Sequence, residues 1–147
     1  MPIMDQLDKL YRNGEFSGPC SEYDIRKAEI ELGVKFPRQY EEFLSKYGSA
    51  LLGGVEIYGL PDPEKNDPPL WQDVVTVTKQ LREWEQAGTE KPSLIPISDD
   101  GTGVYFFIDT DDSPNITIMA IGPGVEKKVS TDLFEFIISL YEGKVTL

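Results

Sequence analysis

Apolar residues recur at every third or fourth position in several stretches of the chain, and this spacing predicts amphipathic helices. It is clearest in residues 38–47, where the apolar side chains fall on one face of a 3.6-residue helix. Gly33 is typical of a left-handed helix end, and Pro37 is typical of the first position of the next helix. We therefore expect two helices to meet at a tight corner in residues 32–37. The predicted helices cover residues 2–12, 21–32, 38–47, 73–87 and 133–142.

Shorter apolar runs between turn residues predict strands. In residues 104–108 the side chains that would point to either face of a strand are apolar. This pattern predicts a central strand covered on both faces. Lys127 and Lys128 favour an edge strand that does not pair with other chains. The predicted strands cover residues 55–58, 94–97, 104–109, 116–121 and 125–129. The fold class is therefore α+β, a single domain over residues 1–147 with N-terminal helices and a C-terminal helix packed on a mainly antiparallel sheet.

Two tryptophans accompany the predicted helix over residues 73–87, with Trp71 just before it and Trp84 inside it. Because a large indole is usually mostly buried, we expect both to fill the core or cover its edge rather than bind a ligand. Four prolines in residues 61–69 exclude a helix or a central strand there, so this segment is a polar loop.

Glu29 is the most informative polar residue of the helix over residues 21–32, because it lies on the same face as Ile25 and Leu32. An unpaired buried carboxylate costs several kcal/mol or more, so Glu29 must find partners. We expect it to accept backbone N–H groups at the corner. A catalytic role for this carboxylate is the alternative.

The corner and its flanks resemble a known family signature. The residues of this signature are Ile25, Ala28, Glu29, Leu32, Gly33, Pro37, Tyr40, Phe43, Leu44 and Gly48, followed by a glycine-rich link into residues 55–58. Their order and spacing are similar to the SUKH superfamily. The later turn at residues 99–103, the strand after it and the helix around residues 134–141 are also similar. In one departure, Tyr47 stands where the family often has an asparagine.

The resemblance implies a role in protein binding. The superfamily includes a fungal regulator of cell-wall synthesis and many bacterial immunity proteins that neutralise polymorphic toxins. It therefore implies either neutralisation of a cognate toxin or a scaffold that regulates cell-wall or signalling enzymes.

The composition excludes several classes of catalytic site. The chain has no histidine, which excludes Ser-His-Asp and Cys-His catalysis and histidine metal sites. A single cysteine, Cys20, excludes an intramolecular disulfide, and we interpret it as an incidental small residue. The N-terminus shows no leader, and no apolar stretch is long enough to span a membrane, so we expect a cytoplasmic protein with no membrane contact. We predict no cofactor and no metal.

The charge balance is strongly acidic, with 26 acidic against 14 basic side chains, a net charge of −12 and a pI near 4.3. Such a surface repels nucleic acid and attracts basic proteins. The alternative is that acidity only keeps the protein soluble.

Aspartates gather in two places, at the opposite ends of the predicted strand over residues 104–109. One interpretation is turn chemistry, since Asp caps backbone N–H groups, and the other is a surface for a basic partner. A calcium loop over residues 109–115 is not supported, because Pro114 stands where a glycine is required and Ala120 where the last glutamate is required. The predicted partner-binding residues are Glu64, Asp67, Asp99, Asp100, Asp109, Asp111 and Asp112.

Three functions are compatible with these features to different degrees. The first is a non-enzymatic immunity protein, monomeric or weakly dimeric, that binds a cognate toxin domain, such as a basic nuclease, through its acidic surface. The second is the regulatory scaffold. The third is a carboxylate-dependent hydrolase using Glu29, Asp99 or Asp109, which is disfavoured because the two aspartate clusters lie too far apart for one catalytic pair. We therefore predict that the protein is not an enzyme.

Overall fold

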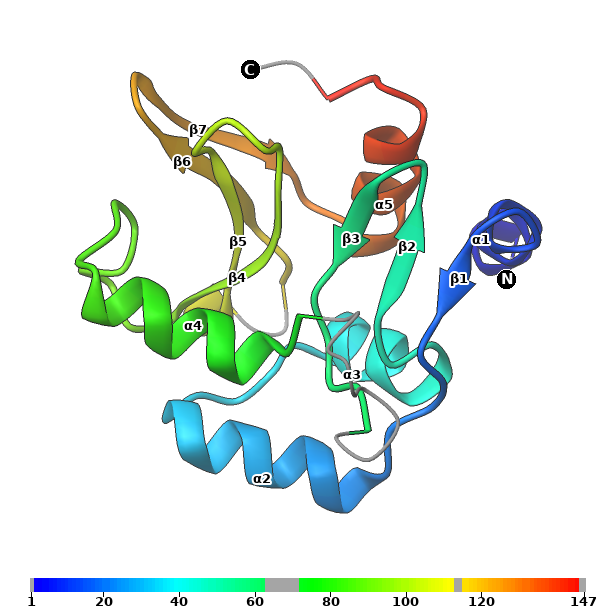
Figure 1. Ribbon diagram of the computed structural model, residues 1–147, viewed down its shortest axis with the longest axis horizontal. Coiled ribbons are helices and arrows are strands. Elements are labelled where there is room, and N and C mark those ends of the chain that lie inside the picture. Colours follow the sequence, from blue (N-terminus) through cyan, green and yellow to red (C-terminus); the bar gives the residue numbers. More distant parts are fainter. Residues whose placement is uncertain (1, 63–71, 113–114, 146–147) are drawn as a thin grey trace.

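The computed structural model describes residues 2–62, 72–112 and 115–145, and this part of the chain contains five helices and two antiparallel sheets (Figure 1). The helices are α1 (Pro2–Tyr11), α2 (Glu22–Leu32), α3 (Arg38–Lys46), α4 (Val74–Glu83) and α5 (Leu133–Tyr141). The strands are β1 (Glu15–Phe16), β2 (Ala50–Leu52), β3 (Val55–Ile57), β4 (Leu94–Asp99), β5 (Tyr105–Asp109), β6 (Ile118–Gly122) and β7 (Val125–Ser130). A short 3-10 helix, η2 (Thr110–Asp112), follows β5. The α+β prediction is confirmed.

The larger sheet has the order β4-β5-β6-β7, so β5 is central and β7 is an edge strand, as predicted. The smaller sheet has the order β1-β2-β3. The two sheets meet where β3 ends beside β4. There the N–H of Tyr58 donates to the carbonyl of Ile97 over 2.8 Å. The hydroxyl of Ser98 also donates to the carbonyl of Glu56 over 2.7 Å. These bonds connect the two sheets.

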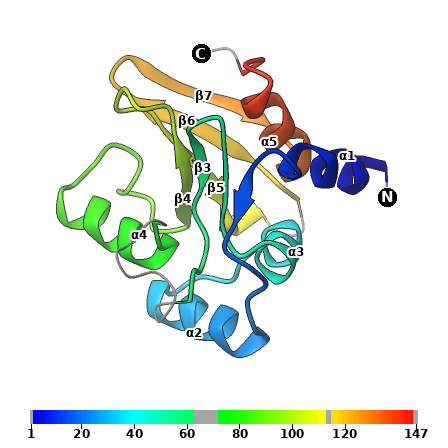
Figure 2. The same ribbon diagram turned by 45° about the vertical axis from the view of Figure 1, so that its right-hand side comes forward.

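The helices lie on different sides of the sheets (Figure 1, Figure 2). In both views α1 and α5 lie together on the side opposite α4, and α2 forms an outer layer beside α4. The hydroxyls of Tyr11 and Tyr141 are 2.8 Å apart and connect α1 to α5. One hydrophobic core runs through all five helices and both sheets, and its largest fully buried side chains include Tyr40, Phe43, Phe106 and Phe136.

The predicted corner between α2 and α3 is confirmed. Gly33 adopts the left-handed conformation with φ 71°, and the N–H groups of Gly33 and Val34 both donate to the carbonyl of Glu29. These bonds satisfy a carbonyl that the helix end would leave unpaired. Pro37 lies one position earlier than expected, as the residue that caps α3 rather than as its first helical residue. Ser21 caps α2 by accepting the N–H of Asp24 over 3.1 Å.

Gly48 and Gly59 allow the chain to cross itself beside the smaller sheet. A Cβ atom built on Gly59 would lie only 1.6 Å from the carbonyl oxygen of Gly48. The same carbonyl accepts the N–H of Leu60 over 3.2 Å. Any side chain at position 59 would break this contact between backbones. Gly48 therefore both ends α3, as expected, and admits the segment after β3.

The prediction that Trp84 fills the core or covers its edge is wrong, because Trp84 is 62% exposed. The cause is an early helix end: α4 stops at Glu83, and Glu85 has a left-handed backbone with φ 55°. Leu81 is the last buried residue of α4. Trp71 lies outside the described residues.

Candidate partner-binding surface

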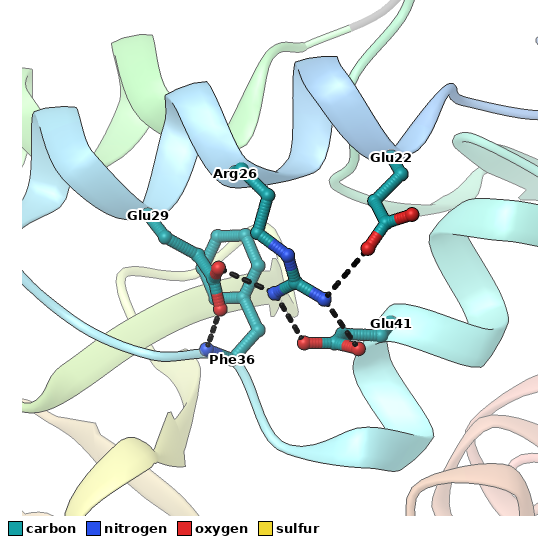
Figure 3. Close-up of polar contacts among 5 residues, drawn as sticks. All are labelled: Glu22, Arg26, Glu29, Phe36 and Glu41. Atoms are coloured by element: carbon teal, nitrogen blue, oxygen red, sulfur yellow. Dashed lines mark hydrogen bonds and ion pairs between the residues drawn. The ribbon is translucent and has the colours of Figure 1, made fainter.

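Glu29 holds the corner between α2 and α3 (Figure 3). One of its oxygens accepts the backbone N–H of Phe36 over 2.6 Å, and the other accepts Arg26 over 2.6 Å. Arg26 also donates to both oxygens of Glu41 on α3, over 2.7 and 3.3 Å, and lies 3.8 Å from Glu22. The expectation that Glu29 accepts a corner N–H is confirmed. With both oxygens engaged, Glu29 acts as a structural carboxylate.

Asp99 and Asp100 shape the turn between β4 and β5. Asp99 accepts the hydroxyl of Tyr58 over 2.5 Å. Asp100 accepts both the N–H and the hydroxyl of Thr102, over 2.8 and 2.7 Å, and the N–H of Val104 over 3.3 Å. Burial acts to raise the pKa of Asp100, but the hydrogen bonds from Thr102 and Val104 outweigh it and lower that pKa. Asp100 is exposed and charged at neutral pH.

Asp109 and Asp111 lie at the end of β5. Asp109 accepts Lys91 over 2.8 Å and the N–H of Asp111 over 3.0 Å. Burial acts to raise the pKa of Asp109, whereas the bonds from Lys91 and Asp111 lower it, and the net shift is downward. Asp111 is exposed. The backbone of Asp112 belongs to η2, but its side chain, like Glu64 and Asp67, lies outside the described structure.

The strand register separates these two sets, which we call the aspartate turns: Asp99 and Asp100 form one, and Asp109 and Asp111 form the other. Asp99 lies opposite Tyr105, whereas Asp109 lies opposite Leu94, so the turns occupy opposite ends of the β4–β5 pair. Their hydrogen bonds agree with the turn interpretation. Among the residues that the structure describes, no group of three or more acidic or sulfur ligands could hold a metal ion.

The outer face of α2 carries exposed apolar residues that the sequence analysis did not identify. Tyr23 is 75% exposed and Ile30 is 81% exposed. The two residues are seven positions apart, so they share one helix face, opposite the buried Ile25 and Leu32. We define the outer face of α2 as Tyr23, Lys27 and Ile30. The signal was present in the sequence, because neither Tyr23 nor Ile30 fits the buried stripe of this helix.

Two grooves flank this outer face. The first, of about 700 Å³, lies between the end of α2, the corner and the segments around Pro92 and Asp111. Ile30, Val34 and Lys35 line its near wall. The second groove, of about 590 Å³, separates α2 from the start of α4. Its lining includes Asp24, Lys27, Glu31, Asp62, Asp73 and Cys20. Of the predicted site residues whose side chains the structure describes, only Asp111 lines either groove.

Cys20, at the edge of the second groove, is not an activated thiol. Its sulfur donates to the carbonyl of Leu60 over 3.2 Å. Burial raises the pKa of the Cys20 thiol to about 11, the opposite of what a nucleophile requires. The structure thus agrees with the interpretation of Cys20 as an incidental small residue.

A family model described as SMI1-KNR4 cell-wall, SUKH_6, matches residues 22–137, from the first turn of α2 into α5. The chain belongs to the SUKH family. The match contains the corner, the aspartate turns and the outer face of α2. This membership supports an immunity or cell-wall-related protein that acts through protein partners, in a family that is generally non-enzymatic.

Solved structures share this SUKH fold. The crystal structure of a protein from Pseudomonas syringae pv. tomato matches with a TM-score of 0.59 and 19% sequence identity, and the match covers 78% of this chain and 81% of that one. At this identity the likeness shows the fold alone. The comparison with curated proteins gave no match. Among the described residues, no helix is both long and apolar enough to cross a bilayer.

Proposed function

We propose that this SUKH protein is a non-enzymatic immunity protein that binds a cognate toxin domain and neutralises it. The partner is a basic protein. A nuclease is the class that fits best, because a protein that binds anionic nucleic acid presents a basic surface. The observation that carries the proposal is the net charge of −12 on a chain of 147 residues. Family membership supports it in general.

The acidic surface acts in two ways on this proposal. It steers a basic partner toward the protein and speeds association, an effect that weakens as salt rises. It also covers the basic surface by which a nuclease would hold its substrate. Asp100 and Asp109, whose pKa values lie below the ordinary value, are charged at neutral pH, as an unperturbed aspartate also is. The site of action we propose is the cytoplasm, where a nuclease meets its substrate.

A second candidate is the scaffold that regulates cell-wall or signalling enzymes. The family description, which names the cell wall, favours this alternative. A scaffold would bind enzymes without inhibiting them. Inhibition of the partner therefore separates the two functions.

The test is a tagged pull-down from the native cell at moderate salt, followed by an activity assay of each retained protein. A parallel pull-down with the tag alone removes proteins that bind the resin. We expect one basic protein in stoichiometric amount, whose toxic or nuclease activity disappears when this protein is added. Retention of cell-wall or signalling enzymes with unchanged activity would overturn the immunity function and favour the scaffold.

A further inference from the structure

We infer that the outer face of α2 is the surface on which the basic partner docks. This inference rests on the proposed function and gives it a location. The partner it requires presents an apolar side chain beside Ile30 and an arginine or lysine beside Tyr23.

Exposure distinguishes α2 from the rest of the molecule. In the part of the chain that the structure describes, four large apolar or aromatic residues are exposed, and two of them, Tyr23 and Ile30, share one helix face. Phe16, the least exposed of the four, packs against the rings of Tyr11 and Tyr47. The opposite face of α2 packs into the hydrophobic core. On this inference, the partner covers Ile30, which is 81% exposed in the free protein.

The shape of the region suits a docked protein segment. The ridge of Tyr23, Lys27 and Ile30 stands between the two grooves described above, because Ile30 lines the first groove and Lys27 lines the second. A partner that places side chains into both grooves would straddle the helix. Such interdigitation buries the aromatic and aliphatic anchors at the centre of an interface, where they contribute most.

The charge beside Tyr23 favours a basic group of the partner at this end of the ridge, whereas Arg26, Lys35 and Lys91 line the first groove at the other end. Tyr23 lies between Glu22 and Asp24 in the first turn of α2, and both carboxylates are exposed. A guanidinium stacked on the tyrosine ring would reach either carboxylate, combining a cation–π contact with a charged hydrogen bond. At the other end, Glu31 on the α4 side is paired with Lys79 across 3.3 Å. Lys27 is the single exposed basic residue within α2.

The ridge is also held in place before any partner arrives. The network of Arg26 and Glu29 fixes α2 against α3 (Figure 3). Arg82 of α4 donates to the carbonyl of Leu32 over 3.4 Å and ties the far end of α2 to α4. A preorganised helix loses little conformational entropy when it binds.

The aspartate turns suit a steering role better than a docking role. Asp99, Asp100 and Asp109 already accept hydrogen bonds from this chain. Neither turn presents an exposed large apolar side chain among the described residues. The turns therefore add long-range attraction, whereas α2 supplies the contact.

The first experiment maps binding with a defined probe and needs no identified toxin. The probe is a synthetic helical peptide with leucines on one face and arginines beside them, titrated at low salt into the isotope-labelled protein. We expect saturable NMR shift changes concentrated in residues 22–31 and in the linings of the two grooves. No saturable change, or changes confined to residues 99–104 and 109–111, would overturn the inference.

The second experiment compares exposed residues of similar type. The double variant Tyr23→Ala/Ile30→Ala should bind the probe at least about tenfold more weakly, a loss of about 1.4 kcal/mol. Trp84→Ala is the matched control, since Trp84 is also an exposed large side chain. Trp84 lies just after the end of α4 and lines neither of the two grooves. The control should bind within about twofold of wild type.

Both variants should melt within a few degrees of wild type, because they truncate exposed side chains. Equal weakening by the double variant and by Trp84→Ala would overturn the inference. The toxin assay separates the two proposals. If wild type and the double variant neutralise the captured toxin equally, the docking face is wrong while the immunity function stands. If wild type neutralises nothing, the immunity function fails, and the peptide map still decides the face.

Discussion

Glu29 at the corner and Asp100 in the β4–β5 turn are both carboxylates that accept backbone N–H groups, yet they lie in opposite environments. Glu29 is 8% exposed and shares its second oxygen with Arg26. Asp100 is exposed, and its bonds stay within its own turn. Burial therefore decides what such a carboxylate does. The buried one joins two helices, whereas the exposed one shapes a turn and leaves its charge free to act on a partner.

The largest expected effect is that of Glu29→Ala. Its loss leaves the N–H of Phe36 unpaired in a buried place and removes one partner of Arg26, so the free energy of unfolding should fall by about 3 kcal/mol. Urea denaturation measures it. Glu29→Gln keeps an oxygen for Phe36 and should lose less.

The control for this prediction is Glu42→Ala, which breaks the exposed pair with Arg38. Its effect should stay within about 0.5 kcal/mol. If Glu29→Ala were as mild as Glu42→Ala, the corner network would not be a determinant of stability.

Asp100→Ala should have a smaller effect, of about 1 kcal/mol, because water can reach the N–H groups that it leaves in the turn. Asp100→Asn keeps an acceptor for Thr102 and should recover most of the loss. Urea denaturation at pH 7 measures both variants. A loss for Asp100→Ala equal to that for Glu29→Ala would contradict the role given to burial.

The pH dependence of Asp100 should be smaller still. Its pKa in the folded protein lies below the usual value of 3.8, so the unfolded chain binds more protons between these two values. The stability that the ionised group contributes is therefore present above pH 3.8 and is lost as pH falls through the folded pKa. Because Asp100 is exposed, the contribution should be below about 1 kcal/mol. Urea denaturation of wild type and Asp100→Asn at pH 7, 5, 4 and 3 should show a difference that shrinks below pH 4. A difference that grows toward pH 3 would contradict the lowered pKa.

The smallest effect on stability is expected for the charge reversal Asp111→Lys/Asp112→Lys, within about 0.5 kcal/mol. Its effect should appear in kinetics, as slower association with the basic partner, most clearly at low salt. Stopped-flow mixing at low and high salt measures the rate. Unchanged kinetics would remove this aspartate turn from the steering surface.

Much of the fold could be predicted from the sequence, where local chemistry and tertiary packing agree. Gly33 and Pro37 indicated the corner because their backbone preferences are strong. The central position of β5 followed from its apolar residues on both faces. The strands β1 and β2 were not predicted, since two or three residues carry no readable alternation. Trp84 was misplaced because α4 ends earlier than its apolar spacing suggests.

The candidate surface was less predictable than the fold. Aspartate positions can be read from a sequence, but their hydrogen-bond partners cannot, as the bond from Tyr58 to Asp99 across 41 positions shows. The exposure of Tyr23 and Ile30 could be read from the buried stripe of α2, but the two grooves beside them form only when the corner and α4 are in place. An interface is therefore recognised mainly from the large apolar residues that remain exposed once the core has formed.

The most direct test of the account is a titration of the captured basic partner's activity with this protein. We predict that activity falls linearly and vanishes at one equivalent of wild type, whereas Tyr23→Ala/Ile30→Ala requires a clear excess. Activity that is unchanged at several equivalents of wild type would contradict neutralisation of the partner by binding to this SUKH protein.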